Sequence, residues 1–351
     1  MNRGKKVALC ALAILSTLSL QAGDRVKWKI ATTWGSAAAP IITATENMAK
    51  YVEQMSGGEF TIRVDSANKH KAPMGVFDMV KGGQYQMGHT TSYFWKGKDI
   101  NLMPFTTMPF GMTAPERMAW MDFGGGMALM EKAYAKYGML AFEGGNTGNQ
   151  MGGWFKKEIK TAEDLKGLRM RIPGFAGEIM SELGVSVTNI PPGELYTSLD
   201  RGTIDALEWV GPGMDIKMGF HKIAPYYYTG WHEPGAEAEY LVNKKAYDKL
   251  SDTHKEILRN AMRLSAYRMY IEFYHENALA WASMKEKYPN IKVKTFPKPI
   301  MDQMRKVNDA LVAKYSTQSP FFKEIVDSQR AYMKKARDWT IISDLDYIQG
   351  Q

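Results

Sequence analysis

Strand-like runs alternate with helical patterns along the first two thirds of the chain, and this alternation restricts the fold more than any other feature. Residues 27–33 (KWKIATT) and 60–65 (FTIRVD) have the apolar spacing of strands, and residues 41–55 between them have that of a helix. Repeated strand–helix–strand units predict an α/β fold with parallel sheets covered by helices. Further strands are expected over 87–93, 139–143, 168–172, 186–190 and 204–210, and further helices over 74–81, 114–137, 161–166, 176–183 and 193–201.

Two long helices are expected in the last third of the chain. The first begins with a capping box formed by Thr253 and Glu256 and ends before Pro289. At about 1.5 Å per residue it would be roughly 50 Å long, enough to span two domains. The second begins at Ser319, which is followed by a proline, and runs through Trp339.

The N-terminus has the pattern of a secretory signal. Three basic residues precede an apolar run over 7–20 that is too short to span a membrane, and Ala22 offers a small residue for cleavage. We therefore expect a signal peptide over residues 1–22 and a periplasmic mature protein. The only cysteine, Cys10, lies within this segment. The mature chain is therefore expected to lack disulfides, a thiolate nucleophile and sulfur-ligated metals.

Length and charge narrow the class of protein further. Cleavage would leave 329 of the 351 residues, which favours two domains over one. Cleavage would also remove three basic residues and reduce the formal charge from +8 to +5. The remaining basic residues are scattered and form no stripe, so nucleic acid is not an expected partner.

One short internal similarity suggests two related halves. When Gly83 is aligned with Gly202, both segments have the pattern of a helix that ends at glycine and continues into a strand. In this alignment His89 and Glu208 occupy equivalent positions at strand ends.

Five polar or aromatic residues lie at or just beyond the ends of strand-like runs: Gln150, Arg171, Glu208, Trp209 and Glu233. Ligands of open α/β sheets bind beyond the carboxyl ends of strands. A guanidinium matches the geometry of a carboxylate. Two carboxylates, an amide oxygen and a backbone carbonyl suit sodium or calcium rather than zinc. This set predicts a site for a small acid and a cation.

The sequence has no recognisable catalytic motif. Its six histidines form no zinc-binding pattern, and there is no GxSxG elbow, dinucleotide fingerprint or Walker loop. Two alternatives remain open at this point. One is a periplasmic hydrolase or lyase that uses His232 or Glu233 as a base, and the other is a sensory protein that presents its ligand to a receptor.

Several motifs resemble the DctP-type solute-binding proteins of TRAP transporters. EDLKGLRMR is typical of the family, and YFWKGKD, GGNTGNQMGGWF, GTIDALEWVGP and APYYYTGW resemble its 2-oxoacid and monocarboxylate branch. The resemblance implies a two-domain, type II-like binding protein with the ligand between the domains and a long helix spanning both. The implied boundaries are 1–22 for the signal peptide, 23–147 with 237–270 for domain I, 148–236 with 271–315 for domain II, and 316–351 for a C-terminal helix.

The resemblance also implies roles for individual residues. Arg171 would bind the substrate carboxylate. A sodium or calcium ion bridging to the substrate would be held by Gln150, Glu208, Glu233 and the backbone of Trp209. We expect further substrate contacts from Gln150, Trp209, Tyr93, Phe175 and Asn146. The implied partners are a small carboxylate such as pyruvate or lactate, the TRAP permease subunits and, through the C-terminal helix, a second copy of the chain.

Overall fold

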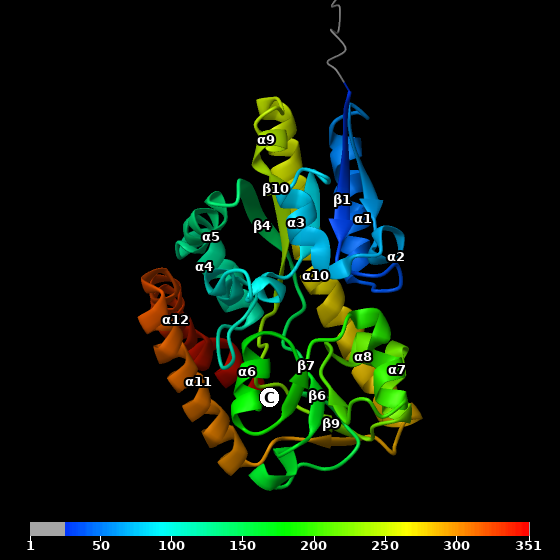
Figure 1. The fold of residues 1–351 in the computed structure, drawn as a ribbon, viewed down its shortest axis with the longest axis vertical. Coiled ribbons are helices and arrows are strands. Elements are labelled where there is room, and N and C mark those ends of the chain that lie inside the picture. The colour runs from blue at the N-terminus through cyan, green and yellow to red at the C-terminus, as the bar shows by residue number, and fades with distance from the viewer. Residues whose placement is uncertain (1–24, 351) are drawn as a thin grey trace, which may run out of the picture.

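The computed structural model describes residues 25–350, so the predicted signal peptide lies outside the described residues. Two sheets lie one above the other in Figure 1. The five-stranded sheet has the order β2-β1-β3-β10-β4, and its strands are β1 (Val26–Thr32), β2 (Phe60–Asp65), β3 (Met87–Thr90), β4 (Met139–Asn146) and β10 (Glu237–Asn243). The six-stranded sheet has the order β11-β9-β5-β8-β6-β7, and its strands are β5 (Gly153–Phe155), β6 (Arg169–Arg171), β7 (Ser186–Thr188), β8 (Ala206–Leu207), β9 (Tyr226–Tyr228) and β11 (Lys292–Lys294).

The α/β prediction is confirmed, but the sheets are not wholly parallel. Strand β10 is antiparallel to β3 and β4, and β5 is antiparallel to β8 and β9. Each of these two strands comes directly after the chain crosses from one sheet to the other. No covering helix intervenes at these crossings, and the strand therefore enters its sheet in the reverse direction.

Helices cover both sheets (Figure 1). Those beside the five-stranded sheet are α1 (Ile41–Met55), α2 (Ala67–His70), α3 (Val76–Lys81), α4 (Ala114–Phe123), α5 (Gly126–Ala135) and α9 (Lys244–Tyr247). Those beside the six-stranded sheet are α6 (Gly174–Glu182), α7 (Leu195–Asp200) and α8 (Pro212–Met218). The C-terminal third contains α10 (Asp252–Lys287), α11 (Lys298–Gln318), α12 (Pro320–Thr340) and α13 (Asp346–Gln349). Short 3-10 turns include η2 (Ser92–Trp95), η3 (Ile100–Phe105) and η4 (Ala162–Leu165), and a π-helical turn, η7 (Ile341–Leu345), joins α12 to α13.

Local signals predicted many of these elements well. Helix α1 and strand β2 have the expected bounds, and Ser319 caps α12 by accepting a hydrogen bond from the Phe322 amide. The helix expected over 114–137 is instead broken at Gly124–Gly125, where Gly125 has a φ of 91°. The N-cap of α10 is Ser251 rather than Thr253. Helix α11 was not predicted.

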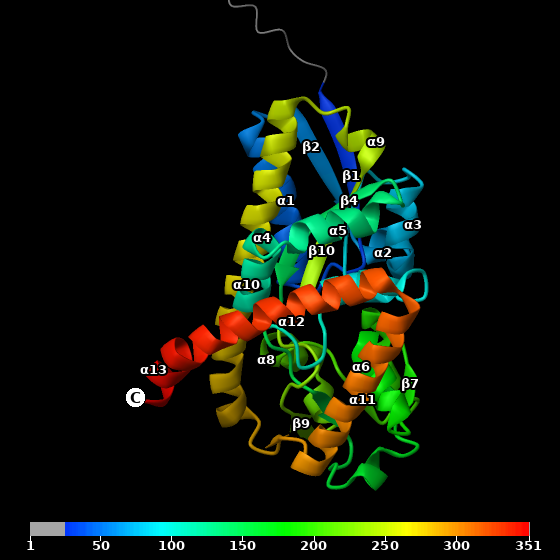
Figure 2. The same ribbon diagram turned by 90° about the vertical axis from the view of Figure 1, so that its left-hand side faces the viewer.

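Helix α10 confirms the prediction of a long helix that spans both halves. It has 36 residues and packs on α1 and β4 of one half and on α8 of the other (Figure 2). None of the helices within residues 25–350 is long and apolar enough to cross a membrane.

The two halves are also joined by shared apolar cores. Tyr93 packs in one cluster with Phe155 and Phe175, and Trp34 packs in another with Trp154. Each cluster combines residues from both halves of the molecule, and the site described below lies where the two halves meet.

The predicted internal similarity is visible in the backbone. Gly83 and Gly202 both adopt left-handed conformations, with φ values of 75° and 72°, and strands β3 and β8 follow them. The two strand-end residues have different environments, however. His89 is buried between the Trp34 indole N–H, which donates to Nδ1, and the Gly144 carbonyl, 2.9 Å from Nε2. Both ring nitrogens of His89 are therefore occupied by the protein itself.

Candidate functional site

The carboxyl ends of two neighbouring strands bring Arg171 and Glu208 together. Strands β6 and β8 pair in parallel with Arg171 opposite Leu207, so the next residue, Glu208, lies at the same edge of the sheet. The backbone N–H of Glu208 donates to the Arg171 carbonyl at 3.0 Å. The Arg171 guanidinium Nη1 in turn donates to the Glu208 carbonyl and to its carboxylate Oε2, the latter at 3.0 Å.

Two further segments join this edge through backbone hydrogen bonds. The amide of Gln150 donates to the Glu233 carbonyl at 2.9 Å, and the amide of Met151 donates to the Val210 carbonyl at 2.8 Å. The structure thus fastens the segment before β5 to the segments after β8 and β9. All five predicted residues are at most 6% exposed, and the site is therefore enclosed.

Burial dominates the electrostatics of the site. It raises the pKa of Glu208 to about 8, and the nearby charge of Arg171 only partly offsets this effect. Burial, reinforced by the charge of Glu208, also raises the pKa of Glu233 to about 8. Burial lowers the pKa of His232 to about 4. The site therefore disfavours two ionised carboxyls unless a further positive charge enters it.

The polar atoms of this cluster lack enough partners. Glu208, His232 and Glu233 each offer a ligand atom, and these atoms lie within 4.8 Å of one another. Within residues 25–350, several buried atoms of the cluster make no hydrogen bond: Gln150 Oε1, Arg171 Nε, Glu208 Oε1, Trp209 Nε1, Glu233 Oε2 and both ring nitrogens of His232. Buried polar atoms are normally paired, so this concentration indicates a site built for a polar ligand. The oxygen atoms among them suit a hard cation.

Charge balance gives the same result. With both carboxyls ionised, Arg171, Glu208 and Glu233 carry a net charge of −1. A bound monocarboxylate would make this −2, which a buried site does not tolerate without compensation. Calcium would bring the total to zero and sodium would bring it to −1. The residues present therefore fit a cation bound together with an acid.

Aromatic side chains enclose the site. The guanidinium carbon of Arg171 lies 5.6 Å from the centre of the Trp209 ring. Tyr93 is 9% exposed, and burial together with the charges of Glu233 and Glu208 raises its pKa well above the ordinary value. Phe175 is buried in the core at the start of α6.

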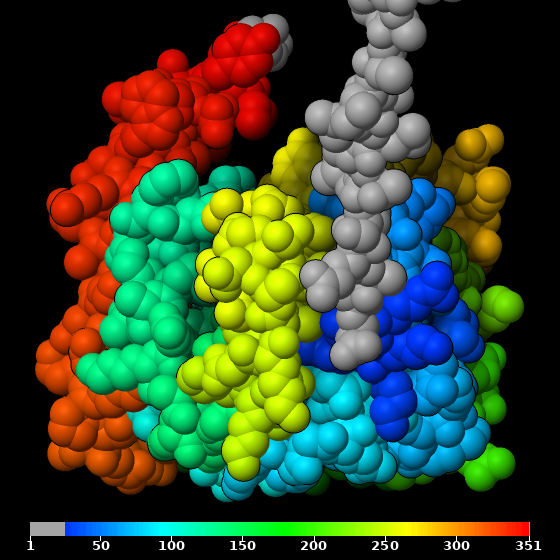
Figure 3. Space-filling model, turned by 90° about the horizontal axis from the view of Figure 1, so that it is seen from above, coloured from blue at the N-terminus to red at the C-terminus, as the bar shows by residue number. Residues whose placement is uncertain are grey.

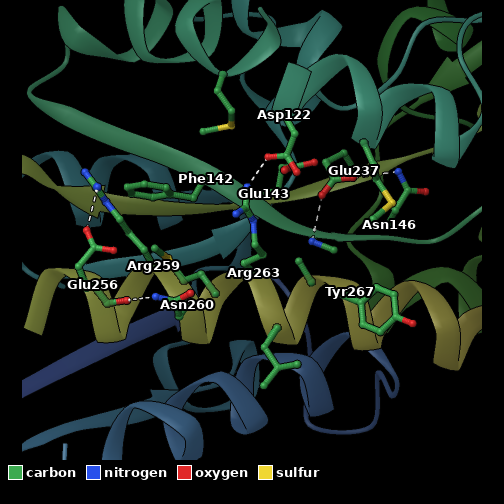
Figure 4. Close-up of a pocket in the computed structure, with 16 residues that line it drawn as sticks. Asp122, Phe142, Glu143, Asn146, Glu237, Glu256, Arg259, Asn260, Arg263 and Tyr267 are labelled. Atoms are coloured by element: carbon green, nitrogen blue, oxygen red, sulfur yellow. Dashed lines mark hydrogen bonds and ion pairs between the residues drawn. The ribbon is translucent and has the colours of Figure 1, made fainter. Parts of the chain in front are cut away.

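Asn146 differs from the other predicted residues. Its Nδ2 donates to Glu237 at 2.9 Å, and its Oδ1 accepts from the Gly148 amide at 2.9 Å. It also lines a separate cavity beside α10 (Figure 4). Both polar ends of Asn146 are occupied, and we leave it out of the ligand set proposed below.

Sequence reasoning missed one residue behind the site, Asp215. Its Oδ1 accepts from the Val210 amide at 3.1 Å. Its Oδ2 accepts from the Trp154 indole at 2.9 Å and from the Tyr227 hydroxyl at 2.8 Å. Burial raises the pKa of this carboxyl to about 7 in spite of these three donors. Asp215 fixes the segment that carries Glu208, and its place in the first turn of α8 was the only available signal.

Known proteins resemble the chain along most of its length. Residues 30–318 match the bacterial extracellular solute-binding protein family 7, DctP. A monocarboxylate 2-oxoacid-binding periplasmic protein of Nostoc sp. is 38% identical, with 97% of this chain and 93% of the relative covered.

Two crystal structures are also similar, and both are TRAP periplasmic solute-binding proteins. One, from Colwellia psychrerythraea, has bound calcium and pyruvate. It is 55% identical with a TM-score of 0.92, and the match covers 93% of this chain and 100% of the other. The second, from Pseudoalteromonas atlantica, has bound sodium and pyruvate. It is also 55% identical with a TM-score of 0.92, and the match covers 93% and 99%.

Proposed function

The chain belongs to bacterial extracellular solute-binding protein family 7, the DctP family, and on this premise we propose that it delivers a small monocarboxylate to a TRAP permease. The substrate class is the 2-oxo or 2-hydroxy acids, such as pyruvate or lactate. The protein acts in the periplasm, to which residues 1–22 direct it. The observation that carries the proposal is the enclosed cluster of unpaired polar atoms around the Arg171–Glu208 pair.

Each residue has a separate role in this proposal. Arg171 binds the substrate carboxylate through its unpaired Nε–H and its guanidinium fork. Gln150 Oε1, Glu208, Glu233 and the backbone carbonyl of Trp209 hold a sodium or calcium ion, which supplies positive charge next to the substrate oxygens. The indole of Trp209 and the rings of Tyr93 and Phe175 surround the acid and exclude water.

Binding and release require the two halves to move apart, because the site residues are buried in the form described above. The Lys96 ammonium bonds to the Glu178 carboxylate at 3.0 Å. Lys96 follows β3 of one sheet and Glu178 lies on α6, beside the other. This contact favours the closed form.

The first test is mass spectrometry and metal analysis of the ligand released from the full chain purified under native conditions. Calorimetric titrations with pyruvate and lactate, with calcium and with a chelator in sodium-free buffer, should show that the acid binds tightly only with the cation. Equal affinity for the acid with calcium and with the chelator would contradict a cation that bridges the acid and the protein. Turnover of pyruvate during long incubation would favour the hydrolase or lyase alternative.

Strand β6 offers a matched pair of variants. Arg171→Met should weaken acid binding by about 2–5 kcal/mol, because it removes the ligand for the carboxylate and leaves Glu208 buried without its partner. This corresponds to at least roughly 30-fold in Kd. Arg169→Met alters an arginine of the same strand that is half exposed and pairs with Asp205. The Arg169→Met variant should bind the acid with wild-type affinity. An equal loss of affinity in both variants would contradict the assignment of Arg171 as the ligand for the carboxylate.

We also propose that the protein forms a homodimer through its C-terminal tail, residues 339–348. The tail projects from the body of the molecule (Figures 2 and 3). It exposes large apolar side chains at 54–70% of their surface: Trp339, Ile341, Ile342, Tyr347 and Ile348. Helix α10 exposes a stripe of its own: Leu264, Tyr267, Ile271 and Tyr274. Paired apolar surfaces of this kind favour association of two copies.

The α10 stripe borders a cavity of about 700 Å³ between α10 and the α4–α5 side of β4, which Tyr267 and Leu264 line (Figure 4). The tail of a second copy is the proposed occupant. Light scattering should give a dimer for the full chain and a monomer for Ile342→Glu and for Tyr267→Glu. Met55→Glu, at an exposed methionine on α1, should remain dimeric. A monomeric wild-type protein would contradict the proposal.

A further inference from the structure

A second cavity, distant in sequence from the acid site, lies between α11, α12 and the loop 108–112. Its volume is about 360 Å³. Helices α11 and α12 meet at an angle (Figure 2), and both contribute to its lining. Met108, Val312 and Val326 provide buried apolar walls. The cavity therefore combines an apolar interior with the polar groups described next.

Three arginines line this cavity, against one aspartate. Within the part of the chain that the structure describes, Arg330 pairs with Asp309 at 3.2 Å and Arg337 pairs with Glu116 at 3.2 Å. Arg305 stacks on an aromatic ring instead, with its guanidinium carbon 4.1 Å from the centre of the Phe110 ring. Stacking leaves the edge of the guanidinium available, so the cavity has an excess of cationic donors for an anion.

Asn308 requires the ligand of this cavity to donate a hydrogen bond. Its side chain is 6% exposed and lines the cavity, and no group within residues 25–350 donates to its Oδ1. A buried amide oxygen normally accepts a hydrogen bond. A ligand that satisfies this cavity must therefore bring a donor as well as negative charge. Hydrogen phosphate has both, whereas sulfate has the charge and no donor.

The wall of the cavity continues to the acid site. Phe110 has a left-handed backbone with a φ of 58°, which is costly for a bulky residue. Two contacts hold it in place. Its amide donates to the Trp231 carbonyl at 3.1 Å, and its ring lies 5.7 Å from the Trp231 ring. Trp231 stands two residues before Glu233, so a shift of Phe110 would reach the backbone that carries this carboxylate.

We propose that this cavity binds a small oxyanion that carries a hydrogen-bond donor, and that its occupancy alters the affinity of the acid site. Arg305 and Arg330 bind the anionic oxygens, and Asn308 accepts from the hydroxyl of the ligand. The link runs from Arg305 through Phe110 and Trp231. The second part of the proposal rests on the function proposed above, and the first part does not.

The test is calorimetric titration of the full chain with inorganic phosphate in a buffer free of phosphate, sulfate and carboxylates. We expect one saturable phosphate site, with binding of sulfate at least tenfold weaker. Arg305→Met keeps an aliphatic side chain on Phe110 and should weaken phosphate binding at least tenfold. Lys306→Met removes a neighbouring positive charge of α11 outside the cavity and should bind as the wild type does.

The possible outcomes separate the two parts. Absence of saturable phosphate binding, or equal loss in the two variants, would overturn the site. Equal affinity for phosphate and sulfate would overturn the role of Asn308. For the coupling, saturating phosphate should change the Kd for pyruvate at least twofold in the wild type and not in Arg305→Met. If phosphate binds and the affinity for pyruvate does not change, the coupling alone is overturned. If phosphate binds and pyruvate does not bind at all, only the function proposed above is contradicted.

Discussion

Replacing Asp215 with asparagine tests whether the acid site depends on a residue that never touches the ligand. The Asp215 carboxylate accepts three hydrogen bonds, from the Val210 amide, the Trp154 indole and the Tyr227 hydroxyl. An asparagine amide keeps the shape but has only one oxygen. Whichever way it turns, its NH₂ group faces the N–H of Val210 or that of Trp154, and this N–H loses its acceptor.

The size of the stability loss in Asp215→Asn follows from the burial of this side chain. Asp215 is 1% exposed, so the N–H that loses its acceptor cannot form a hydrogen bond with water instead. An unpaired buried donor costs about 1–3 kcal/mol. We expect Asp215→Asn to lower the free energy of unfolding by that amount. A further expectation is weaker calcium binding, about 5- to 100-fold, because Asp215 holds the amide of Val210, two residues after Glu208.

Urea unfolding and calcium calorimetry at one fixed pH measure the two effects. Asp205→Asn is the matched control, because Asp205 is half-buried and pairs with Arg169 near the surface. It should change stability by less than about 1 kcal/mol and leave calcium affinity intact. An Asp215→Asn protein that loses stability yet binds calcium normally would refute the positioning role. A protein with unchanged stability would refute the hydrogen-bond argument.

Three other predictions use the same site. The two site glutamates have folded-state pKa values of about 8, above their ordinary 4.5, so their contribution to stability is complete below pH 4.5 and is lost as the pH rises to 8. Cation-free protein should therefore unfold more easily at pH 8 than at pH 6.5, by about 1.4 kcal/mol per pH unit and group at most. Lys96→Met should weaken pyruvate binding about two- to threefold, because its ion pair with Glu178 is partly exposed. Gly230→Ala should abolish cation binding, because its Cβ would lie 1.9 Å from the Gln150 carbonyl.

Each of these has its own measurement. Urea unfolding at pH 6.5 and at pH 8 measures the slope, which the buried histidines partly offset near their ordinary pKa of 6.5. Calcium should reduce the slope by the share of the two site glutamates, and other buried acids such as Asp215 keep theirs. Stability that rises over this range would contradict the sign. For Lys96→Met, calorimetry that shows unchanged affinity would mean that the contact does not stabilise the closed form. Gly193→Ala, where a Cβ meets nothing within 4 Å, is the control for Gly230→Ala. Normal calcium binding by the Gly230 variant would contradict the close approach.

Elements governed by neighbouring residues could be predicted from the sequence. The bounds of α1 follow from apolar spacing, the start of α12 follows from the Ser319 cap, and the length of α10 follows from an uninterrupted pattern. The antiparallel β10 and β5 could not be predicted, because strand direction depends on where the chain crosses between sheets. Helix α11, which has five buried residues on a largely polar chain, was missed for a similar reason: its partners are distant in sequence.

The same division applies to the acid site. The chemical groups of the site can be read from the sequence, because Gln150, Arg171, Glu208 and Glu233 each lie at or just beyond the end of a strand-like run, where an α/β sheet binds its ligand. Whether these groups are charged and whether they have hydrogen-bond partners depends on how the distant segments pack together. Burial is a property of the whole fold, and it raises the pKa of both glutamates and leaves polar atoms without partners. Contacts between distant segments likewise turned Asn146 toward Glu237 and placed Asp215 behind the site.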